Sequence, residues 1–420
     1  MLQYGVSVSD SKIIDVLIIG SGGAGCSAAL TASDAGKKVT LLTRTEFLDS
    51  KTSRAQGGVQ APIAEGDTPD KLYEDTLKAG EYLNDKSLTR LLADNAKEAI
   101  EWMINIGIKF DTNKKGEFLQ RTAAGLSHPR ILSCGDESGN RIMKPLIEAV
   151  SASEVNVVTY RTVTNIIKQK DLFHIESYDP RNNIEYEFVA RTVILATGGG
   201  VPKEKRAGLS FMGDRPPPDS IELAEKIGLE LESPELTQYH PTGIVTPKEL
   251  RRKPIPELLR SMGAVLLNRK GEIFTDSMMT RKKLCDAIVE ECEIGNGEKT
   301  KDGRIGVWLD TPQVDKINGS GYTAIHFSTL YNQMLKLGHD ITKKRVLIYP
   351  IAHYTLGGIK IGPDCMTAVR GIFAAGEATW GVHGADRLMG NSLLEIFVFG
   401  RLAGQSAAKH IDSNTKLEAM

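Results

Sequence analysis

The sequence predicts a doubly wound α/β domain that is interrupted by a smaller, inserted α+β domain. Three apolar runs, at residues 13–19, 193–196 and 371–375, are each followed within two residues by glycine, as buried parallel strands that end in tight turns are. Because these runs lie far apart in the chain, the α/β domain is expected to be discontinuous. The predicted division is 12–235 with 346–412 for this domain, 236–345 for the inserted capping domain, and 413–420 for a tail.

Composition describes an ordinary globular protein. The chain has 420 residues, 41% apolar and 25% charged, which is enough to bury the cores of two domains. A formal net charge of −1 gives no electrostatic reason to expect nucleic acid or an anionic membrane as a partner. The basic run at residues 248–253 is therefore expected to be a solvated loop.

Cysteine usage and apolar runs bear on location. The five cysteines include no Cys-x-x-Cys pair, haem-attachment motif or cluster-binding run, so we expect no bound metal or haem. No run approaches the roughly 18 apolar residues of a membrane span, and the N-terminus lacks a signal pattern. We expect a protein of the reducing cytoplasm.

The first glycine motif has the order strand, turn, helix. Residues 13–19 lead into GSGGAG, and a stretch of small residues with helical character follows at 26–35. The first glycine of such a motif permits the tight turn, the second lets the backbone approach a pyrophosphate, and the third lets helix and strand pack closely. The predicted dinucleotide-binding residues are Gly20, Gly22, Gly23, Ala24 and Gly25.

Two further segments continue this pattern. A second strand at 38–42 ends in Thr43-Arg44, where an NAD-binding fold usually has an acid for the ribose, and this disfavours NAD. The later runs end in Ala196-Thr197-Gly198 and in Gly376-Glu377. Both look like the later nucleotide-binding segments of flavoproteins with two dinucleotide folds. That resemblance implies that Glu377 accepts hydrogen bonds from ribose or ribityl hydroxyls.

Residues 383–395, HGADRLMGNSLLE, place Arg387 in a loop just before an apolar helix. A helix N-terminus carries about half a positive charge and can face the N1–C2=O edge of a flavin. The chain here strongly resembles the flavoprotein family of fumarate reductases, succinate dehydrogenases and L-aspartate oxidases. The resemblance implies a glutathione-reductase-like FAD domain, to which Asn391, Ser392 and Leu393 would contribute at the helix start.

Residues 50–59, SKTSRAQGGV, match the second flavin-contacting loop of that family. Paired glycines let backbone N–H groups come close to the ring system, which assigns Ala55, Gln56, Gly57 and Gly58 to FAD binding. In succinate dehydrogenases and membrane fumarate reductases a histidine of this loop is bonded covalently to the flavin. Lys51 stands at that position, so the resemblance implies non-covalent FAD.

Two segments match substrate-binding motifs of the family, QYHPTG at 238–243 and PIAHYTLGGI at 350–359. The resemblance implies that His353 and Arg387 hold one substrate carboxylate and that His240 helps to hold the other. Charge-assisted, bidentate bonds of this kind fix a substrate carbon over flavin N5 and draw electrons from the neighbouring double bond.

The family's proton relay can be matched to three residues. Glu257 and Arg260 fit a Glu-x-x-Arg pair on one helical face, although a surface ion pair is the plainer interpretation. Arg281 aligns with the proton-donating arginine; another registration places Cys285 there and removes the acid. Arginine can act as an acid only if its proton is returned at once in a site closed to water.

Several positions depart from the family pattern. Pro256 replaces a threonine that offers a hydroxyl to the substrate, and Asp386 replaces an asparagine and adds a negative charge beside Arg387. The glutamate that meets the ammonium group in aspartate oxidases falls on Ala123. His128 and Arg130 align with retained residues that either support the site or have structural roles. The chain stops soon after residue 408, so we expect no C-terminal helical domain.

The favoured function is transfer of a hydride and a proton across a C=C bond next to a carboxylate, of the fumarate-to-succinate type. The substrate is a small dicarboxylate or another unsaturated acid. One alternative is L-aspartate oxidase, which Ala123 disfavours. Another alternative is an electron-transfer subunit that passes electrons between FAD and an iron–sulfur partner. The departures from the family's substrate-site pattern at Pro256, Met262 and Asp386 favour this alternative.

Overall fold

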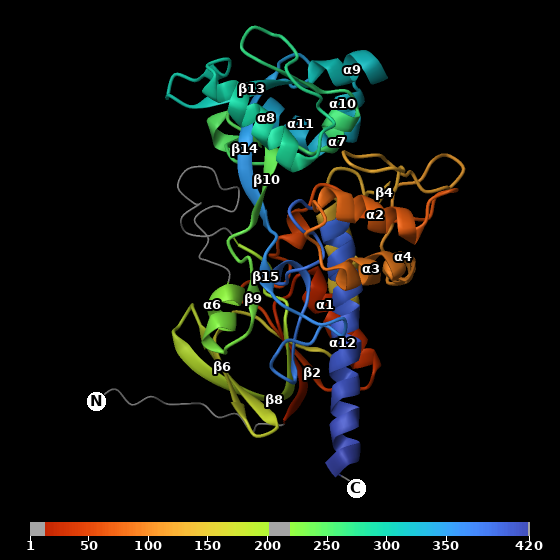
Figure 1. Ribbon diagram of the computed structural model, residues 1–420, viewed down its shortest axis with the longest axis vertical. Coiled ribbons are helices and arrows are strands. Elements are labelled where there is room, and N and C mark those ends of the chain that lie inside the picture. Colours follow the sequence, from red (N-terminus) through yellow and green to blue (C-terminus); the bar gives the residue numbers. More distant parts are fainter. Residues whose placement is uncertain (1–12, 201–218, 419–420) are drawn as a thin grey trace.

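The computed structural model describes residues 13–200 and 219–418, with side chains through 413 except at 219 and 220. The chain forms a larger lobe around a mixed sheet and a smaller lobe at one end of the molecule (Figure 1). A hydrophobic core lies in each lobe. The smaller core also includes Ala123, Ile131 and Met389 from the larger lobe, so apolar packing continues between the lobes.

The larger lobe is built on a seven-stranded sheet in the order β5-β2-β1-β8-β7-β6, with β16 also paired to β8. The first four strands and β16 run parallel, whereas β8, β7 and β6 are antiparallel. Three predicted glycine-ended runs thus lie on adjacent strands, β1, β8 and β16. The strand bounds are β1 Ile14–Ile19, β2 Val39–Leu42, β5 Asn156–Val158, β6 Thr162–Gln169, β7 Leu172–Asp179, β8 Ile184–Leu195 and β16 Ile372–Ala374.

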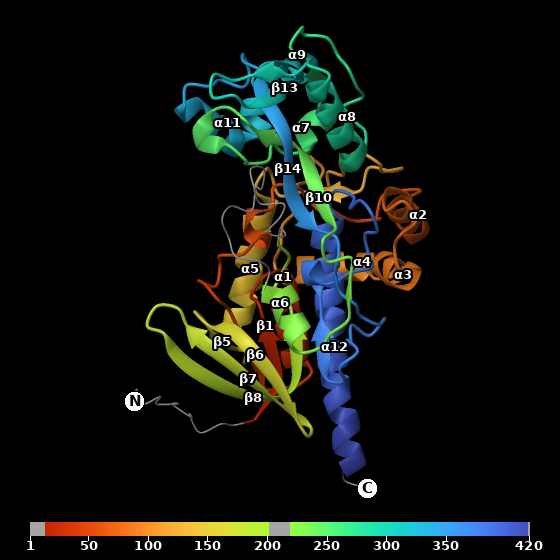
Figure 2. The ribbon, with the colours of Figure 1, turned by 60° about the vertical axis from the view of Figure 1, so that its left-hand side comes forward.

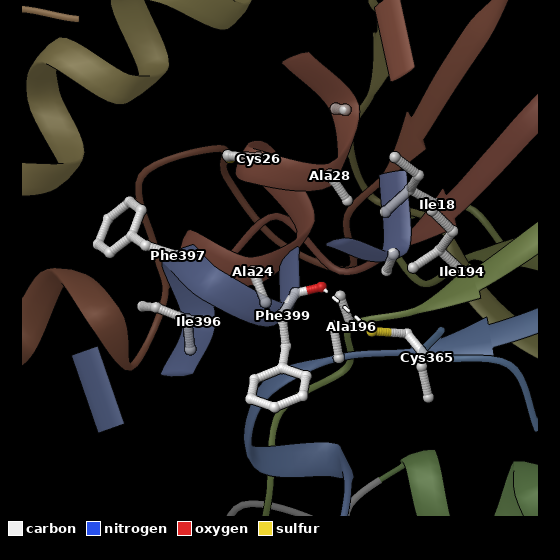
Figure 3. Packing of buried hydrophobic residues seen from close by; sticks show 14 of the residues in the cluster. Ile18, Ala24, Cys26, Ala28, Ile194, Ala196, Cys365, Ile396, Phe397 and Phe399 are labelled. Atoms are coloured by element: carbon white, nitrogen blue, oxygen red, sulfur yellow. Dashed lines mark hydrogen bonds between the residues drawn. The ribbon is translucent and has the colours of Figure 1, made fainter. Parts of the chain in front are cut away.

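Two helices pack closely against each other beside this sheet, α1 (Gly23–Asp34) and α12 (Asn391–Glu418). Figure 3 shows Ala24 of α1 near Ile396 and Phe399 of α12. The close approach depends on glycine: a Cβ at Gly400 would lie 2.6 Å from the Ala24 carbonyl oxygen, and one at Gly404 would lie 2.5 Å from that of Ala28.

We expect Gly404→Ala to destabilise the protein by about 1–3 kcal/mol, because overpacking forces the two helices apart. Helix propensity alone would favour alanine by about 1 kcal/mol, so the sign of the change distinguishes the two effects. Urea unfolding followed by circular dichroism measures it. Gln405→Ala, on the same turn, is the matched control; a Gly404→Ala variant as stable as wild type would contradict the packing argument.

Further helices surround the larger lobe. The bounds are α2 Pro69–Ala79, α3 Lys86–Asp94, α4 Ala96–Asn105, α5 Ser138–Ala152 and α6 Asp219–Lys226. Two short two-stranded sheets complete this part of the chain. In one, β3 (Val59–Gln60) pairs with β4 (Ile131–Leu132), and in the other, β9 (Leu231–Glu232) pairs with β15 (Gly358–Ile359). The segment predicted as a tail from 413 is helical as far as Glu418.

The smaller lobe contains a five-stranded antiparallel sheet in the order β10-β14-β13-β11, with β12 on β13. Figures 1 and 2 show β10 and β14 running from this lobe toward the larger one. The bounds are β10 Thr237–Ile244, β11 Val265–Leu267, β12 Glu298–Lys299, β13 Ile305–Asp310, β14 Val346–Thr355, α7 Leu258–Ser261, α8 Arg281–Glu293, α9 Pro312–Asn318, α10 Tyr322–His326 and α11 Ser328–Lys336.

The division of the chain at 235/236 and 345/346 remains a prediction. The second cut falls at the first residue of β14, a strand that pairs with β13 and β10 before it reaches the larger lobe. Among the residues that the structure describes, no helix is long and apolar enough to cross a bilayer.

Candidate active site

One continuous cavity of about 880 Å3 connects the glycine motif of β1 with the substrate-motif residues of β10 and β14. Most predicted site residues line it. The exceptions are Gly25, Gly376, Asn391 and Arg260. The predicted residues on the wall are Gly20, Gly22, Gly23, Ala24, Thr43, Arg44, Ala55, Gln56, Gly57, Gly58, Ala196, Thr197, Gly198, Glu377, Ser392, Leu393, His240, Glu257, Arg281, His353 and Arg387.

The glycine turn after β1 has the geometry that a dinucleotide needs. Gly20 has φ of +112°, and a Cβ there would lie 2.2 Å from the Ala196 carbonyl oxygen. A Cβ on Gly25 would lie 1.8 Å from the Gly20 oxygen, so this glycine permits helix–strand contact rather than lining the cavity. Gly22 instead faces open space, with only the Thr52 hydroxyl 3.5 Å from an added Cβ.

The middle of the cavity is lined by the loop at 50–58 and by Glu377. The Lys51 Nζ lies 3.6 Å from Glu377 Oε1 and donates to the Gly199 carbonyl oxygen, so it is held in the cavity wall. The Thr355 backbone N–H fixes the same Glu377 oxygen at 3.0 Å. Asn391 lies elsewhere: its side chain is buried and donates to Thr76 Oγ1, which joins α12 to α2.

The other end of the cavity brings His240, His353 and Arg387 together. The two imidazole rings lie 5.1 Å apart, and the Arg387 guanidinium lies over the Tyr354 ring at 4.6 Å. Arg387 Nε is buried with no hydrogen-bond partner among the described residues. A buried guanidinium with an unsatisfied donor on a cavity wall favours an anionic ligand.

His240 is held by its own strand. The Thr242 backbone N–H lies 3.3 Å from Nδ1, and the Thr242 hydroxyl donates to the Ile255 carbonyl oxygen. Nδ1 is then the acceptor, which leaves the proton on Nε2. Burial, followed by the charges of Arg281, Arg260 and Arg387, keeps the pKa of His240 well below its ordinary value.

Arg281 and Glu257 form a buried pair at this end. The Arg281 Nε–H donates to Glu257 Oε2 at 2.8 Å, and Arg260 lies 3.5 Å from the other carboxylate oxygen and donates to the Ser277 carbonyl. The plainer interpretation, a surface ion pair, is wrong, because Glu257 and Arg260 are both buried. Cys285 lies one turn further along α8, outside the cavity lining, which favours the registration that uses Arg281.

The charges of this group depend on one another. Burial alone would raise the pKa of Glu257, but the attraction of Arg281 and Arg260 outweighs it and lowers that pKa. Burial, together with repulsion from Arg281, lowers the pKa of Arg387 to about 10. Burial and the neighbouring His240 hold the pKa of His353 well below its ordinary value. At neutral pH this buried group therefore combines three guanidinium groups and one carboxylate with two neutral imidazoles.

Two positions that depart from the family pattern, Asp386 and Ala123, were expected next to the substrate but lie outside the cavity lining. Asp386 is buried and outside the cavity lining: it accepts hydrogen bonds from Gln238 Nε2 and from the Lys282 backbone, so its charge is not presented to the substrate. Ala123 is packed in the core of the smaller lobe. Pro256 does line the cavity.

Arg130 and His128 lie outside the cavity lining. The fully buried Arg130 donates to both oxygens of Asp67, at 2.9 and 2.8 Å, and to Asp75 Oδ2 at 2.9 Å. His128 is half-buried, and its ring lies 3.1 Å from Lys71 Nζ. Of the two roles left open from the sequence, these contacts favour the structural one.

The sequence patterns missed other residues of the site. Tyr354 is the next residue after His353, and its hydroxyl donates to Glu395 at 2.7 Å. Gln238 accepts from Arg281 at 3.0 Å. The basic run expected as a solvated loop contributes Arg251, Arg252 and Lys253 to the cavity lining. The one signal in the sequence that could have indicated this run is its cluster of positive charges, in a chain whose net charge is close to zero.

A model of a protein family described as an FAD binding domain matches residues 15–393. The chain belongs to this family. It is a flavin-dependent oxidoreductase whose cofactor is FAD, related to fumarate reductases and L-aspartate oxidases. The resemblance inferred from the sequence is thus confirmed.

Two relatives illustrate the similarity. One of the subunits of the fumarate reductase (CoM/CoB) of Methanothermobacter marburgensis is 34% identical over 417 residues, which is 96% of this chain and 74% of the relative. The L-aspartate oxidase of Clostridium acetobutylicum is 32% identical over 419 residues, 96% of this chain and 91% of the relative.

Solved structures share the fold of this FAD-binding flavoprotein. A variant of E. coli quinol fumarate reductase superposes with a TM-score of 0.88 at 24% identity, covering 97% of this chain and 72% of that one. The apo form of the Mycobacterium smegmatis Sdh1 complex gives a TM-score of 0.79 at 29% identity, covering 96% and 69%.

Proposed function

We propose that this flavoprotein reduces the C=C bond of a fumarate-like dicarboxylate, with Arg281 as the proton donor. The observation that carries the proposal is the group of Arg281, Arg387, His240 and His353 at one end of the cavity whose other end has the glycine turn. The residues present fit FAD, because the open face of Gly22 and the positive φ of Gly20 leave room for a pyrophosphate beside α1.

Binding is assigned to the cationic and imidazole groups. Arg387 and His353 hold one carboxylate, and the Nε2–H of His240 donates to the other. Pro256 offers no hydroxyl on this wall, so His240 carries more of the second contact than in relatives with threonine there. An unsaturated monocarboxylic acid is for this reason included among the substrates to be tested.

Bound FAD supplies hydride transfer at flavin N5. Arg281 donates a proton to the alkene carbon next to the one that receives the hydride, which converts the double bond into a CH–CH single bond. Arg281 is short of one proton after this step and recovers it through Glu257 and Arg260, which lie within 3.5 Å of each other. Closure of the smaller lobe over the site excludes water, which an arginine acid requires.

Three further features belong to the proposal. The larger lobe acts as the doubly wound FAD domain, and the smaller one as a capping domain. The FAD is non-covalent, because Lys51 occupies the position of the flavin-bonded histidine of some relatives. The electrons come from a partner protein, an iron–sulfur protein among the candidates, or from a diffusible reductant.

L-aspartate oxidase activity is the second candidate function, because a relative with that name is 32% identical and the alignment covers 91% of its length. Anaerobic spectra distinguish the two. The proposal expects that dithionite-reduced protein is reoxidised by fumarate, or by crotonate, and that oxidised protein is not bleached by L-aspartate. Bleaching by aspartate without reoxidation by any unsaturated acid would replace the first candidate with the second.

The proposed function also predicts a pH dependence. The pKa of about 10 for Arg387 means that its cation is lost as pH rises through that value. Because only the cation binds a carboxylate, kcat/KM for fumarate should be level from about pH 8 to 9 and fall about tenfold per pH unit above the pKa. Retained FAD absorbance checks that the fold persists. A level profile to about pH 11 would contradict the role of Arg387.

A further inference from the structure

We infer that Asp386 is a positioning residue for Arg281: its carboxylate caps α8 from the opposite lobe and orients the proton donor through Gln238. This inference rests on the proposed function for its catalytic consequence, whereas its structural part stands independently. Asp386 belongs to the loop before α12, and α8 and β10 belong to the smaller lobe.

The first turn of α8 is poorly stabilised by its own residues. It begins Arg281-Lys282-Lys283, so three cations lie at the positive end of the helix dipole, and the N-cap Thr280 makes no side-chain hydrogen bond to the helix. The missing acceptor comes from 104 residues further along the chain: the Lys282 backbone N–H donates to Asp386 Oδ2 at 3.0 Å. Asp386 thus supplies both a cap and a compensating negative charge to the turn that carries Arg281.

The second Asp386 oxygen acts through Gln238. Gln238 Nε2 donates to Asp386 Oδ1 at 2.5 Å and to the Arg387 carbonyl oxygen at 2.8 Å, and Gln238 Oε1 accepts from Arg281 at 3.0 Å. All four side chains are buried. The guanidinium of Arg281 is therefore held on two sides, by Gln238 and by Glu257.

Donor and acceptor chemistry explains why an acid is needed at position 386. Arginine offers only donors, so Gln238 must turn its oxygen toward Arg281 and its amino group toward Asp386. The Lys282 N–H is a donor as well. Residue 386 must therefore accept at both oxygens, which aspartate does and asparagine does not. With asparagine, its amino group would face either the Lys282 N–H or the Gln238 amino group, so that two donors meet. If Gln238 flips its amide to avoid this, it loses the hydrogen bond that its oxygen accepts from Arg281.

The test compares Asp386→Asn with wild type in the FAD-loaded protein. We expect faster amide hydrogen exchange in the first turn of α8 and a kcat for fumarate reduction that is about 10- to 100-fold lower, as a misplaced catalytic group gives. The solvent isotope effect on reoxidation of the reduced flavin should increase, because the proton transfer becomes slower than the hydride transfer.

A double variant provides the rescue. Asp386→Asn combined with Gln238→Glu restores partners for Arg281, for residue 386 and for the Lys282 N–H. The new carboxylate accepts from Arg281 and from the amide at 386, and the amide oxygen accepts from the Lys282 N–H. The Arg387 carbonyl oxygen loses the donor that Gln238 supplied. The double variant should recover much of the lost kcat. Glu81→Gln is the control, because it removes an exposed ion pair at 2.6 Å that joins Lys282 to the loop after α2 and not to the loop that carries Asp386.

The outcomes separate the inference from the proposed function. Exchange in α8 that is unchanged by Asp386→Asn, or changed equally by Glu81→Gln, would overturn the cap. Faster exchange with an unchanged kcat would overturn the orienting role. If wild-type protein reduces no unsaturated acid, the proposed function fails, and the exchange measurement alone decides whether Asp386 holds α8.

Discussion

Replacing Arg281 with alanine should lower kcat for fumarate reduction by about 10² to 10⁴-fold, the usual contribution of a positioned general acid. Arg281 lines the cavity, and its guanidinium is fixed by Glu257 and Gln238. Cys285 is no substitute for it, because this residue lies outside the cavity lining and burial raises the pKa of its thiol. Anaerobic reoxidation of the reduced flavin in a stopped-flow instrument measures the effect.

Lys283→Ala is the matched control for Arg281→Ala. It removes one positive charge from the same turn of α8, but Lys283 is exposed and does not line the cavity. We expect its kcat within about twofold of wild type. If Arg281→Ala keeps kcat within tenfold of wild type while Lys283→Ala does likewise, Arg281 is not the acid, and a role in electron transfer to a partner protein gains support.

Replacing Arg130 with methionine should destabilise the protein by about 3–5 kcal/mol, because it leaves buried carboxylates without their cation. Arg130 is fully buried and makes three hydrogen bonds to Asp67 and Asp75. A change of this size is a large fraction of the stability of a typical domain. Chemical unfolding monitored by circular dichroism gives the shift of the midpoint.

Arg90→Met is the control for this stability prediction. Arg90 also pairs with two aspartates, Asp70 at 2.7 Å and Asp94 at 2.5 Å, but these pairs are exposed to solvent. Exposed pairs contribute about 0–1 kcal/mol. Adding Asp67→Asn and Asp75→Asn to Arg130→Met should recover part of the loss. Equal effects of Arg130→Met and Arg90→Met would show that burial does not determine the contribution of Arg130.

The features that the sequence predicted correctly are those that follow from local backbone requirements. Gly20 must adopt a positive φ beneath Ala196, and this requirement is visible as a glycine after an apolar run. The same local pattern located β1, β8 and β16, which are adjacent in the sheet. His240 and His353 lie in motifs on β10 and β14, and antiparallel pairing brings them together.

What the sequence could not predict depends on contacts between distant segments. The position of Asp386 beside Arg387 suggested a charge near the substrate, yet its side chain turns to the start of α8, a helix on the other lobe. Arg130 gave no sign of its partners Asp67 and Asp75, because nothing local marks a buried ion pair. Residues 251–253 reach the cavity through the fold of their lobe, not through their composition.

The pairing of β10 with β14 limits how the two lobes can move relative to each other. The two strands form a paired ribbon between the lobes, His240 lies on one strand and His353 on the other, and the register shifts near both. Sliding one lobe past the other would break the ladder between the strands, whereas bending or twisting at the irregular register leaves it intact. A motion that bends this ribbon therefore moves both imidazoles together, and it separates them from Arg387 only if the hydrogen bonds of Gln238 to Asp386 and to the Arg387 carbonyl oxygen break.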